Sequence, residues 1–453
     1  MFSKILIANR GEIAIRVIRA CKEMGISTVA VFSEADRDAL HVKLADESYC
    51  IGGARPRESY LNARSIISAA LVSKAEAIHP GYGFLSENSE FSDLCKENNI
   101  VFIGPPGDVI AKMGDKEAAR REMAAANFPV IPGCELVENA DHAKKEAERI
   151  GFPLVIKASA GGGGKGIRLV KSMDKIEHSY NLATQEALAS FNDGSVYMEK
   201  FLTGVKHIEM QILADNFGNV VCLGERDCSM QRRNQKLVEE SPSVGISDKT
   251  RSEMIAAAVN ASKAVGYRGA GTIECLCDTE GNFYFMEMNT RLQVEHPVTE
   301  MVTGKDLVKW QIRIASGIQL DFTQEEIQFT GHAIECRINA ENPYQDFRPS
   351  AGKIEMLHIP GGPWVRFDTA IYHGYSIPPF YDSMIGKLIV AARTREEAIR
   401  KMKAALCELI IDGVEHNSEL QMEIMLTEEF EKGNHTTDTL EKYLNEMKER
   451  ASK

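Results

Sequence analysis

Residues Gly271–Pro297, GTIECLCDTEGNFYFMEMNTRLQVEHP, predict two β-strands joined by a tight turn. Thr272–Cys277 and Phe283–Met288 are rich in residues that favour strands. The DTEGN sequence between them carries the residues that turns prefer. We therefore expect a β-hairpin at the centre of the fold.

Two glutamates of this hairpin are predicted to face each other. If Asp278 and Phe283 close a loop of four residues, Glu274 lies opposite Glu287. Cross-strand partners point to one face, with Cβ atoms about 4.5–5.5 Å apart, so the carboxylates repel unless a cation lies between them. Asn289 follows on the same face, and such oxygen ligands suit Mg²⁺ with phosphate and water. We predict a Mg²⁺–nucleotide site; the alternative is a solvent-facing hairpin whose glutamates sit apart in water.

The composition is that of a globular protein with several domains. The chain has 453 residues, 44% of them hydrophobic and 26% charged, which is enough for two or three domains. Its net charge of −12 argues against nucleic acid as the main partner. The ten cysteines are scattered without a zinc spacing, as in a reducing cytoplasm. No apolar run approaches ~20 residues and no signal peptide is recognisable, so we expect a cytoplasmic protein without a membrane partner.

The first third of the chain alternates strands with helices. Lys4–Ala8 reads as a buried strand, and the turn at Gly11 leads into an amphipathic helix. The alternation continues through a strand at Val101–Ile103, which predicts a parallel, doubly wound sheet. The first turn holds one glycine and no GxGxxG, so the signal for nicotinamide binding is weak to absent. A long helix, Val109–Ala126, is expected to leave this sheet.

A glycine-rich loop, Gly161–Gly166, lies between two predicted strands. It is not a P-loop, because Ser159 and Gly166 occupy the positions that need Gly and Ser or Thr. Its backbone can expose N–H groups to phosphates, so we favour a lid over the alternative of a plain tight turn. Lys157 and Lys116 are candidate phosphate contacts, although a single lysine is more often a surface residue.

From Thr203 onward the pattern becomes largely antiparallel. Lys206–Leu213 alternates cleanly, with polar residues on one face and apolar residues on the other. Helices are expected at Val298–Ser316 and Arg395–Leu409. The polar end of the chain, Glu428–Lys453, is expected to fray.

Three further stretches carry candidate chemistry. The segment Val196–Leu202 connects two predicted domains, where backbone groups could bind a purine, or it is an ordinary strand end. Cys228–Val238 is dense in hydrogen-bond donors and suggests an anion pocket, or else a solvated basic loop. Glu295 with Arg291 could place a general base beside a bound anion, and Arg337 could reach the same cleft.

Taken together, the motifs resemble the biotin carboxylase family, the ATP-grasp subunit of bacterial acetyl-CoA carboxylase. The resemblance covers about Ser3–Asp412 and is carried by KILIANRGEIAIRVIRA, HPGYGFLSE, IKASAGGGGKGI, HIEMQI, GERDCSMQRR, MEMNTRLQVEHPVTE and FRPSAGKI. It implies a three-part ATP-grasp architecture that mixes α/β and α+β. The expected parts are a PreATP-grasp domain with a doubly wound parallel sheet (1–114), a linker helix with a glycine-loop lid (115–202), and a mixed, largely antiparallel core and C-terminal domain (203–453).

The resemblance also implies a reaction and its residues. MgATP, with Mn²⁺ as a possible substitute for Mg²⁺, would activate bicarbonate to carboxyphosphate, which carboxylates biotin. Metal contacts would come from Glu274, Glu287 and Asn289, and bicarbonate contacts from Lys236, Arg291, Gln293 and Val294. Glu295 would be the base, Arg337 would stabilise the biotin enolate, and Tyr82 would contact biotin. The implied ATP contacts are Lys116, Lys157, Gly163, Gly164, Glu199, Lys200, Phe201, Leu202, His207, Gln231, Asn234, Glu274, Leu276 and Glu287.

Two departures from the family pattern bear on this expectation. Many relatives carry His where this chain has Asn234, which puts the nucleotide contact of Asn234 in doubt. Met402–Lys403 superficially matches a biotin attachment site, but it falls inside a predicted helix and not on a hairpin turn. We therefore expect biotin to arrive on a separate carrier protein, with separate carboxyltransferase subunits. The resemblance further suggests a homodimer, for which the helix that bears Arg19 and Glu23 is the candidate contact.

Two other functions remain open on the sequence. A different ATP-grasp ligase, of the carbamoyl-phosphate or peptide type, would share the metal hairpin but would not need Arg291, Glu295 and Arg337. A nucleotide-binding subunit without turnover would show no ATPase activity with any substrate. ADP release that depends on bicarbonate and free biotin separates both from a biotin carboxylase.

Overall fold

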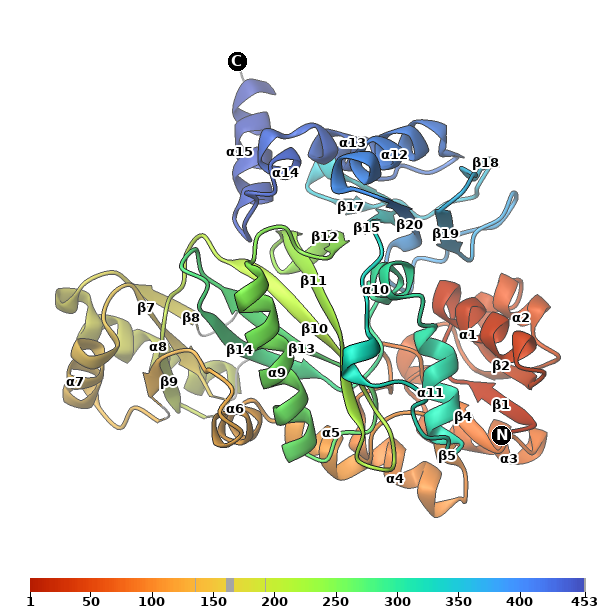
Figure 1. The fold of residues 1–453 in the computed structure, drawn as a ribbon, viewed down its shortest axis with the longest axis horizontal. Helices are drawn as coiled ribbons and strands as arrows, with labels where there is room; N and C mark the ends of the chain where they lie inside the picture. The colour runs from red at the N-terminus through yellow and green to blue at the C-terminus, as the bar shows by residue number, and fades with distance from the viewer. Residues whose placement is uncertain (135, 160–166, 192, 452–453) are drawn as a thin grey trace.

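A computed structural model describes residues 1–134, 136–159, 167–191 and 193–451. The predicted ATP contacts Gly163 and Gly164 lie outside these residues. Three larger sheets organise the described chain (Figure 1), and two further sheets have two strands each. The boundaries predicted at 114 and 202 remain a prediction.

The N-terminal sheet has five parallel strands in the order β3-β2-β1-β4-β5. Its strands are β1 (Lys4–Ile7), β2 (Ser27–Ser33), β3 (Glu47–Gly52), β4 (Ala77–His79) and β5 (Val101–Phe102). The helices between them include α1 (Gly11–Glu23), α2 (Leu40–Leu44), α3 (Ala63–Ser73) and α4 (Ser89–Glu97). The predicted doubly wound parallel sheet is confirmed. The strand order reverses between β1 and β4, where open parallel sheets place their ligand crevices.

A second, smaller sheet packs its own core. Its antiparallel strands, in the order β6-β9-β7-β8, are β6 (Gly133–Cys134), β9 (Val196–Lys200), β7 (Leu154–Ala158) and β8 (Ile167–Val170). Helices α7 (Ala140–Ile150) and α8 (Ile176–Phe191) cover it, and Ala147, Leu154 and Met198 are fully buried between them. In Figure 1 this part projects on the side of the central sheet opposite the N-terminal sheet.

The central sheet has eight antiparallel strands and holds most of the predicted site. Its order is β14-β13-β10-β11-β12-β15-β20-β19. The bounds are β10 (Lys206–Ala214), β11 (Val220–Arg232), β12 (Gln235–Ser241), β13 (Gly269–Cys277), β14 (Phe283–Asn289), β15 (His332–Asn339), β19 (Val365–Thr369) and β20 (Met384–Ala392). Helix α9 (Asp248–Ala264) packs on β10 and β11, while α12 (Arg395–Glu408) and α13 (Ser418–Leu426) pack with β15 and β20. The largely antiparallel second half is confirmed.

Two helices predicted as continuous are each broken, which corrects the sequence analysis. Val109–Ala126 forms α5 (Gly107–Gly114) and α6 (Lys116–Ala125), because Asp115 is extended and its carboxylate caps the N–H of Ala118 at 2.7 Å. Val298–Ser316 forms α10 (His296–Thr303) and α11 (Leu307–Ala315). There the left-handed Gly304, at φ 67°, ends the first helix.

The central hairpin has the predicted partners but a different turn. Asp278 donates its N–H to the carbonyl of Asn282 at 2.9 Å, so three residues, not four, form the loop. A bulge between Glu274 and Cys275 then shifts the register by one residue. Because of this bulge, Glu274 still pairs with Glu287, as predicted.

The polar end of the chain is helical and not frayed through residue 451. It forms α14 (Glu428–Glu431) and α15 (Thr439–Ala451), and Phe430 and Leu440 are buried against the C-terminal core. These two buried apolar side chains pack the polar C-terminal segment against the core. Met402–Lys403 lies on α12, as predicted, with Met402 fully buried. Among the described residues we find no helix long and apolar enough to cross a membrane.

Candidate active site

The polar face of β10 forms the floor of the site. His207, Glu209 and Gln211 alternate along this strand, as predicted, and all three are buried. His207 Nε2 lies 2.8 Å from Glu274 Oε2 on the neighbouring strand β13. Ligand atoms of His207, Glu209 and Glu274 all lie within 4.8 Å of one another. A buried polar face of this kind is expected at a binding site, since isolated polar groups are costly to bury.

Arg226 on β11 connects the polar residues of this floor by hydrogen bonds. Its guanidinium is fully buried, and it donates to Gln211 Oε1 and Gln293 Oε1, both at 2.6 Å. It also donates to Thr272 Oγ1 at 3.1 Å and to Glu209 Oε2 at 3.2 Å. The sequence analysis quoted GERDCSMQRR but gave Arg226 no role. The signal that could have found it is the charged run Glu225–Asp227 within a segment of strand-forming residues.

The predicted metal residues lie together at the hairpin. Glu274 Oε1 accepts from Asn289 Nδ2 at 2.8 Å, from Gln293 Nε2 at 2.6 Å and from Lys236 Nζ at 3.0 Å. Burial would raise the pKa of Glu274, but Lys236 and His207 hold it below its ordinary value. The pKa of Glu287 is raised by burial and then by the charge of Glu274. The repulsion expected between facing carboxylates is therefore present, and a divalent cation would relieve it.

Glu287 and Asn289 also line a cavity of about 210 Å³. Lys116, the first residue of α6, lines the same cavity, and its charge opposes the raised pKa of Glu287. This cavity brings together one predicted phosphate contact and two predicted metal ligands.

Lys236, Glu295 and Arg337 form a second cluster beside the first. Glu295 Oε1 accepts from Lys236 Nζ at 2.8 Å, and Glu295 Oε2 accepts from Arg337 Nη2 at 3.0 Å. Lys236 also contacts Glu209, and Arg337 Nε donates to Glu239 Oε1 at 2.6 Å. Burial alone would raise the pKa of Glu295, yet Lys236 and Arg337 hold it well below its ordinary value. Glu295 is thus an ionised carboxylate held between two cations.

Arg291 bonds to Glu87 and Asn289 at the end of the hairpin. Its Nε donates to Glu87 Oε2 at 2.8 Å and its Nη2 to Asn289 Oδ1 at 2.8 Å. Glu87, which precedes α4, also accepts from the backbone N–H of Thr290 at 3.0 Å. The N-terminal part therefore holds the end of the hairpin through Glu87, a residue to which the sequence analysis gave no role.

Several of the predicted nucleotide-binding residues of the small sheet already bond to other groups of the protein. Lys157 Nζ lies 2.5 Å from Glu199 Oε2, and Lys200 Nζ donates to the carbonyl of Phe152 at 2.8 Å. The N–H groups of Lys200 and Phe201 bond to Pro132 and Pro153, so they are not available to a purine. No partner for the N–H of Leu202 is found in the described part of the chain. Leu276 lies on β13, where it pairs with His207 of β10. Its side chain is half-buried.

Only part of the donor-rich segment Cys228–Val238 faces the site, which corrects the predicted anion pocket. Arg232 donates to Asp346 Oδ1 at 2.8 Å and stacks on Phe347, 4.0 Å from the ring centre. Arg233 and Asn234 have φ of 47° and 65° and form the exposed turn between β11 and β12. Asn234 thus suits the left-handed turn. Gln231 is buried at the end of β11, and Lys236 alone of the segment's cations contacts Glu295.

Tyr82 lies against a buried ion pair. Its hydroxyl bonds to Glu12 Oε1, and Lys387 Nζ lies 5.8 Å from the centre of its ring. Lys387 also donates to the carbonyl of Val294 at 2.8 Å. The predicted biotin contact and the predicted bicarbonate contact are therefore linked by one lysine.

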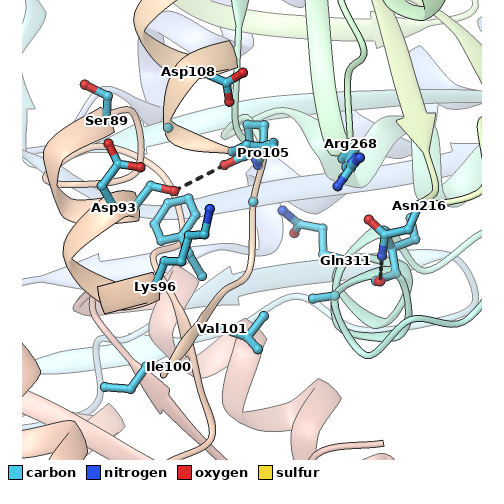
Figure 2. Close-up of a pocket in the computed structure, with 18 of the residues that line it drawn as sticks. Ser89, Asp93, Lys96, Ile100, Val101, Pro105, Asp108, Asn216, Arg268 and Gln311 are labelled. Carbon is cyan, nitrogen blue, oxygen red and sulfur yellow. Dashed lines mark hydrogen bonds between the residues drawn. The ribbon is translucent and has the colours of Figure 1, made fainter. Parts of the chain in front are cut away.

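A larger cavity, of about 830 Å³, contains none of the predicted site residues (Figure 2). It lies between α4, α5 and α11, with Lys96 and Arg268 on opposite sides and Gln311 between them. It is separate from the two clusters described above.

Comparisons with known proteins all point to one family. Three family models match: biotin carboxylase N-terminal domain at 1–110, carbamoyl-phosphate synthase L chain ATP-binding domain at 115–323, and biotin carboxylase C-terminal domain at 335–442. Biotin carboxylase 1 of Bacillus subtilis is 54% identical over 98% of this chain and 99% of its own length. Biotin carboxylase of Haemophilus influenzae is 55% identical, with the same coverage. The chain belongs to the biotin carboxylase family.

Solved biotin carboxylases have the same fold. The biotin carboxylase–β,γ-ATP complex of Campylobacter jejuni superposes with a TM-score of 0.92 at 50% identity, covering 98% of this chain and 99% of that one. The biotin carboxylase domain dimer of Hydrogenobacter thermophilus 2-oxoglutarate carboxylase, solved with MgADP and bicarbonate, gives 0.91 at 51% identity, covering 98% of each chain. Membership of the biotin carboxylase family, together with the ATP-grasp domain, makes this chain an ATP-dependent ligase.

Proposed function

We propose that this protein carboxylates biotin with bicarbonate, using MgATP. The observation that carries the proposal is Glu295, held ionised between Lys236 at 2.8 Å and Arg337 at 3.0 Å. This cluster shares Lys236 with the metal carboxylate Glu274. The proposed base Glu295 and the cations Lys236 and Arg337 would then lie beside the proposed Mg²⁺–phosphate site. Phosphorylation of bicarbonate and carboxylation of biotin need these groups close together.

The reaction follows from the chemistry of bicarbonate, which is a poor electrophile. An oxygen of bicarbonate attacks the γ-phosphorus of ATP, ADP leaves, and carboxyphosphate forms while Glu295 takes the bicarbonate proton. Carboxyphosphate then breaks into CO₂ and a basic phosphate ion. This phosphate takes the ureido proton of biotin, and the deprotonated ureido nitrogen attacks the CO₂ to form N-carboxybiotin. Arg337 stabilises the enolate oxygen of biotin, whose charge develops only during the reaction.

Residue roles are proposed on the same basis. Lys236, Arg291, Gln293 and the loop at Val294 would bind bicarbonate, with Gln293 fixed in place by Arg226. Glu274, Glu287 and Asn289 would hold Mg²⁺, which neutralises charge on the phosphates when it is bound. The nucleotide would lie between this hairpin and the small sheet that carries Lys157 and Glu199. Closure of that sheet would protect carboxyphosphate from water.

The partners are proposed from the resemblance and from the names of relatives. We propose that biotin arrives on a separate carrier protein, that carboxyltransferase subunits use the product, and that the complex is a cytoplasmic acetyl-CoA carboxylase of fatty acid synthesis. Relatives are also named as a 2-oxoglutarate carboxylase small subunit and as part of pyruvate carboxylase. Pairing the protein with each type of purified carboxyltransferase tests the acceptor. The dimer named for the Hydrogenobacter domain supports a homodimer, which analytical ultracentrifugation tests.

The activity is tested by following ADP release with each substrate omitted in turn. We expect ADP release with MgATP to require bicarbonate and to rise when free biotin is added. Carbon-13 from labelled bicarbonate should appear in N-carboxybiotin by mass spectrometry. ADP release that is independent of bicarbonate, or that requires ammonia or an amino acid, would instead favour another ATP-grasp ligase.

A further inference from the structure

Lys387 is a fully buried lysine that lies beside the proposed site without forming part of it. It is on β20, directly opposite Arg337 on β15, so both side chains point to one face of the central sheet. Two cations placed this close repel each other unless each has its own carboxylate. Arg337 has Glu239 and Glu295, whereas Lys387 has Glu12, 3.2 Å from its Nζ.

Glu12 and Tyr82 meet Lys387 because of the topology of the N-terminal sheet. Glu12 follows β1 and Tyr82 follows β4, and these strands are parallel neighbours at the point where the strand order reverses. Their following turns therefore lie at the same edge, where Tyr82 bonds to Glu12. Lys387 reaches this edge from the central sheet, so the ion pair joins the two parts.

Two other buried acids lie near Lys387, and neither bonds to it. Asp368, directly opposite Lys387 on β19, accepts instead from Arg366 Nε at 2.9 Å and Arg366 Nη2 at 2.6 Å. Glu335 is fully buried, and neither of its oxygens has a hydrogen-bond partner in the described residues. Burial raises the pKa of Glu335 well above its ordinary value, and its carboxyl group forms no hydrogen bond to Lys387. Glu12 is therefore the partner that balances Lys387, and a change at either residue breaks the link.

We propose that Lys387 is a positioning residue for biotin carboxylation. Its bond to the carbonyl of Val294, at 2.8 Å, fixes the loop that carries Gln293 and Glu295, while its bond to Glu12 fixes the wall that carries Tyr82. It sets the distance between the bicarbonate side and the biotin side of the site. This inference rests on the proposed function. It names Lys387 as the residue that couples bicarbonate activation to biotin carboxylation.

Lys387→Met tests the proposal, with Lys206→Met as a matched control. Lys206 is also buried and also bonds one carboxylate and one carbonyl: Asp227 Oδ2 at 3.0 Å and the carbonyl of His435 at 2.9 Å. For Lys387→Met we expect ATP binding within about twofold of wild type. We expect the KM for bicarbonate to rise, and the N-carboxybiotin formed per ADP to fall, by about tenfold or more, because small misplacements of reacting groups are costly.

Lys206→Met should lose stability to a similar degree and keep the wild-type ratio of N-carboxybiotin to ADP. If Lys387→Met does not fold, Glu12→Gln weakens the same link with a side chain of equal size and should lower the ratio in the same direction. Glu335→Gln should change it little, because neither oxygen of Glu335 bonds to Lys387 or to another described residue.

A ratio and a KM that change no more in Lys387→Met and Glu12→Gln than in Lys206→Met would overturn the inference and leave the proposed function standing. Wild-type protein that releases no bicarbonate-dependent ADP would instead refute the proposed function, before any variant is made.

Discussion

Glu274 and Glu287 face each other across β13 and β14 although the turn that joins these strands is one residue shorter than the sequence suggests. The bulge beside Glu274 compensates for the shorter turn. A one-residue slip would otherwise have moved one glutamate to the opposite face of the sheet. The retained pairing places two carboxylates on one face, as a metal site requires.

Glu274→Gln and Glu287→Gln should each weaken Mg²⁺-dependent nucleotide binding by about tenfold or more, because each removes a charged oxygen ligand. Nucleotide binding without metal should change much less. Titration calorimetry with ATP, with and without Mg²⁺, measures both. Metal-dependent binding equal to that of wild type in both variants would remove the hairpin from the metal site.

Arg337→Ala should reduce biotin carboxylation by at least about a hundredfold while ATP affinity stays near that of wild type. The reason is that Arg337 contacts Glu295 and the proposed enolate, and none of the proposed metal residues. Arg232→Ala is the matched control, since Arg232 pairs with Asp346 on the other side of the turn. Equal losses of carboxylation and ATP binding in Arg337→Ala would contradict its role.

Arg226→Met should lower the free energy of unfolding by roughly 3–5 kcal/mol, since it leaves buried polar groups of β10 and the loop at Gln293 without their donor. Arg149→Met, at an exposed pair with Glu146, should cost under about 1 kcal/mol. Urea denaturation compares the two. Similar small losses would show that Arg226 is not the structural centre of the floor.

The Glu240 carboxylate predicts an acid-sensitive contribution to stability. It is buried between His332 Nε2 and Arg395 Nε, each 2.7 Å from Glu240 Oε2. Although burial would raise its pKa, these partners lower it from 4.5 to about 2. Because the folded pKa is the lower one, the contribution is present above about pH 4.5 and is lost as the pH falls toward about 2.

The Tm difference between wild type and Glu240→Gln should therefore be largest near neutral pH and shrink between about pH 4.5 and 2. At about 1.4 kcal/mol per pKa unit, the contribution is roughly 3–4 kcal/mol at most. A Tm difference that is independent of pH in this range would mean that Glu240 is not ionised in the folded protein.

The sequence was informative wherever local periodicity decides the structure. The alternation of His207, Glu209 and Gln211 and the parallel βα rhythm are of this kind, and both were confirmed. Helix breaks at Asp115 and Gly304 were missed, because a single cap or left-handed residue interrupts an otherwise continuous helical pattern. The length of the hairpin loop was predicted wrongly because three-residue and four-residue loops use the same residue types.

Long-range contacts could not be read from the sequence. Lys387 is 93 residues from Val294, and Arg291 is 204 residues from Glu87, so no local pattern indicates either contact. Arg226 and Arg232 are alike in sequence, yet one is fully buried among site residues and the other pairs with Asp346 at the surface turn. Only packing of the sheets distinguishes them.

The most direct test of the proposed chemistry follows an oxygen atom. When bicarbonate labelled with oxygen-18 attacks ATP, the bridging oxygen of carboxyphosphate comes from bicarbonate and stays with phosphorus when CO₂ departs. We predict one oxygen-18 atom in the phosphate released per turnover, measured by mass spectrometry with MgATP and biotin present. Phosphate that carries no label while ADP accumulates would contradict activation of bicarbonate by this protein.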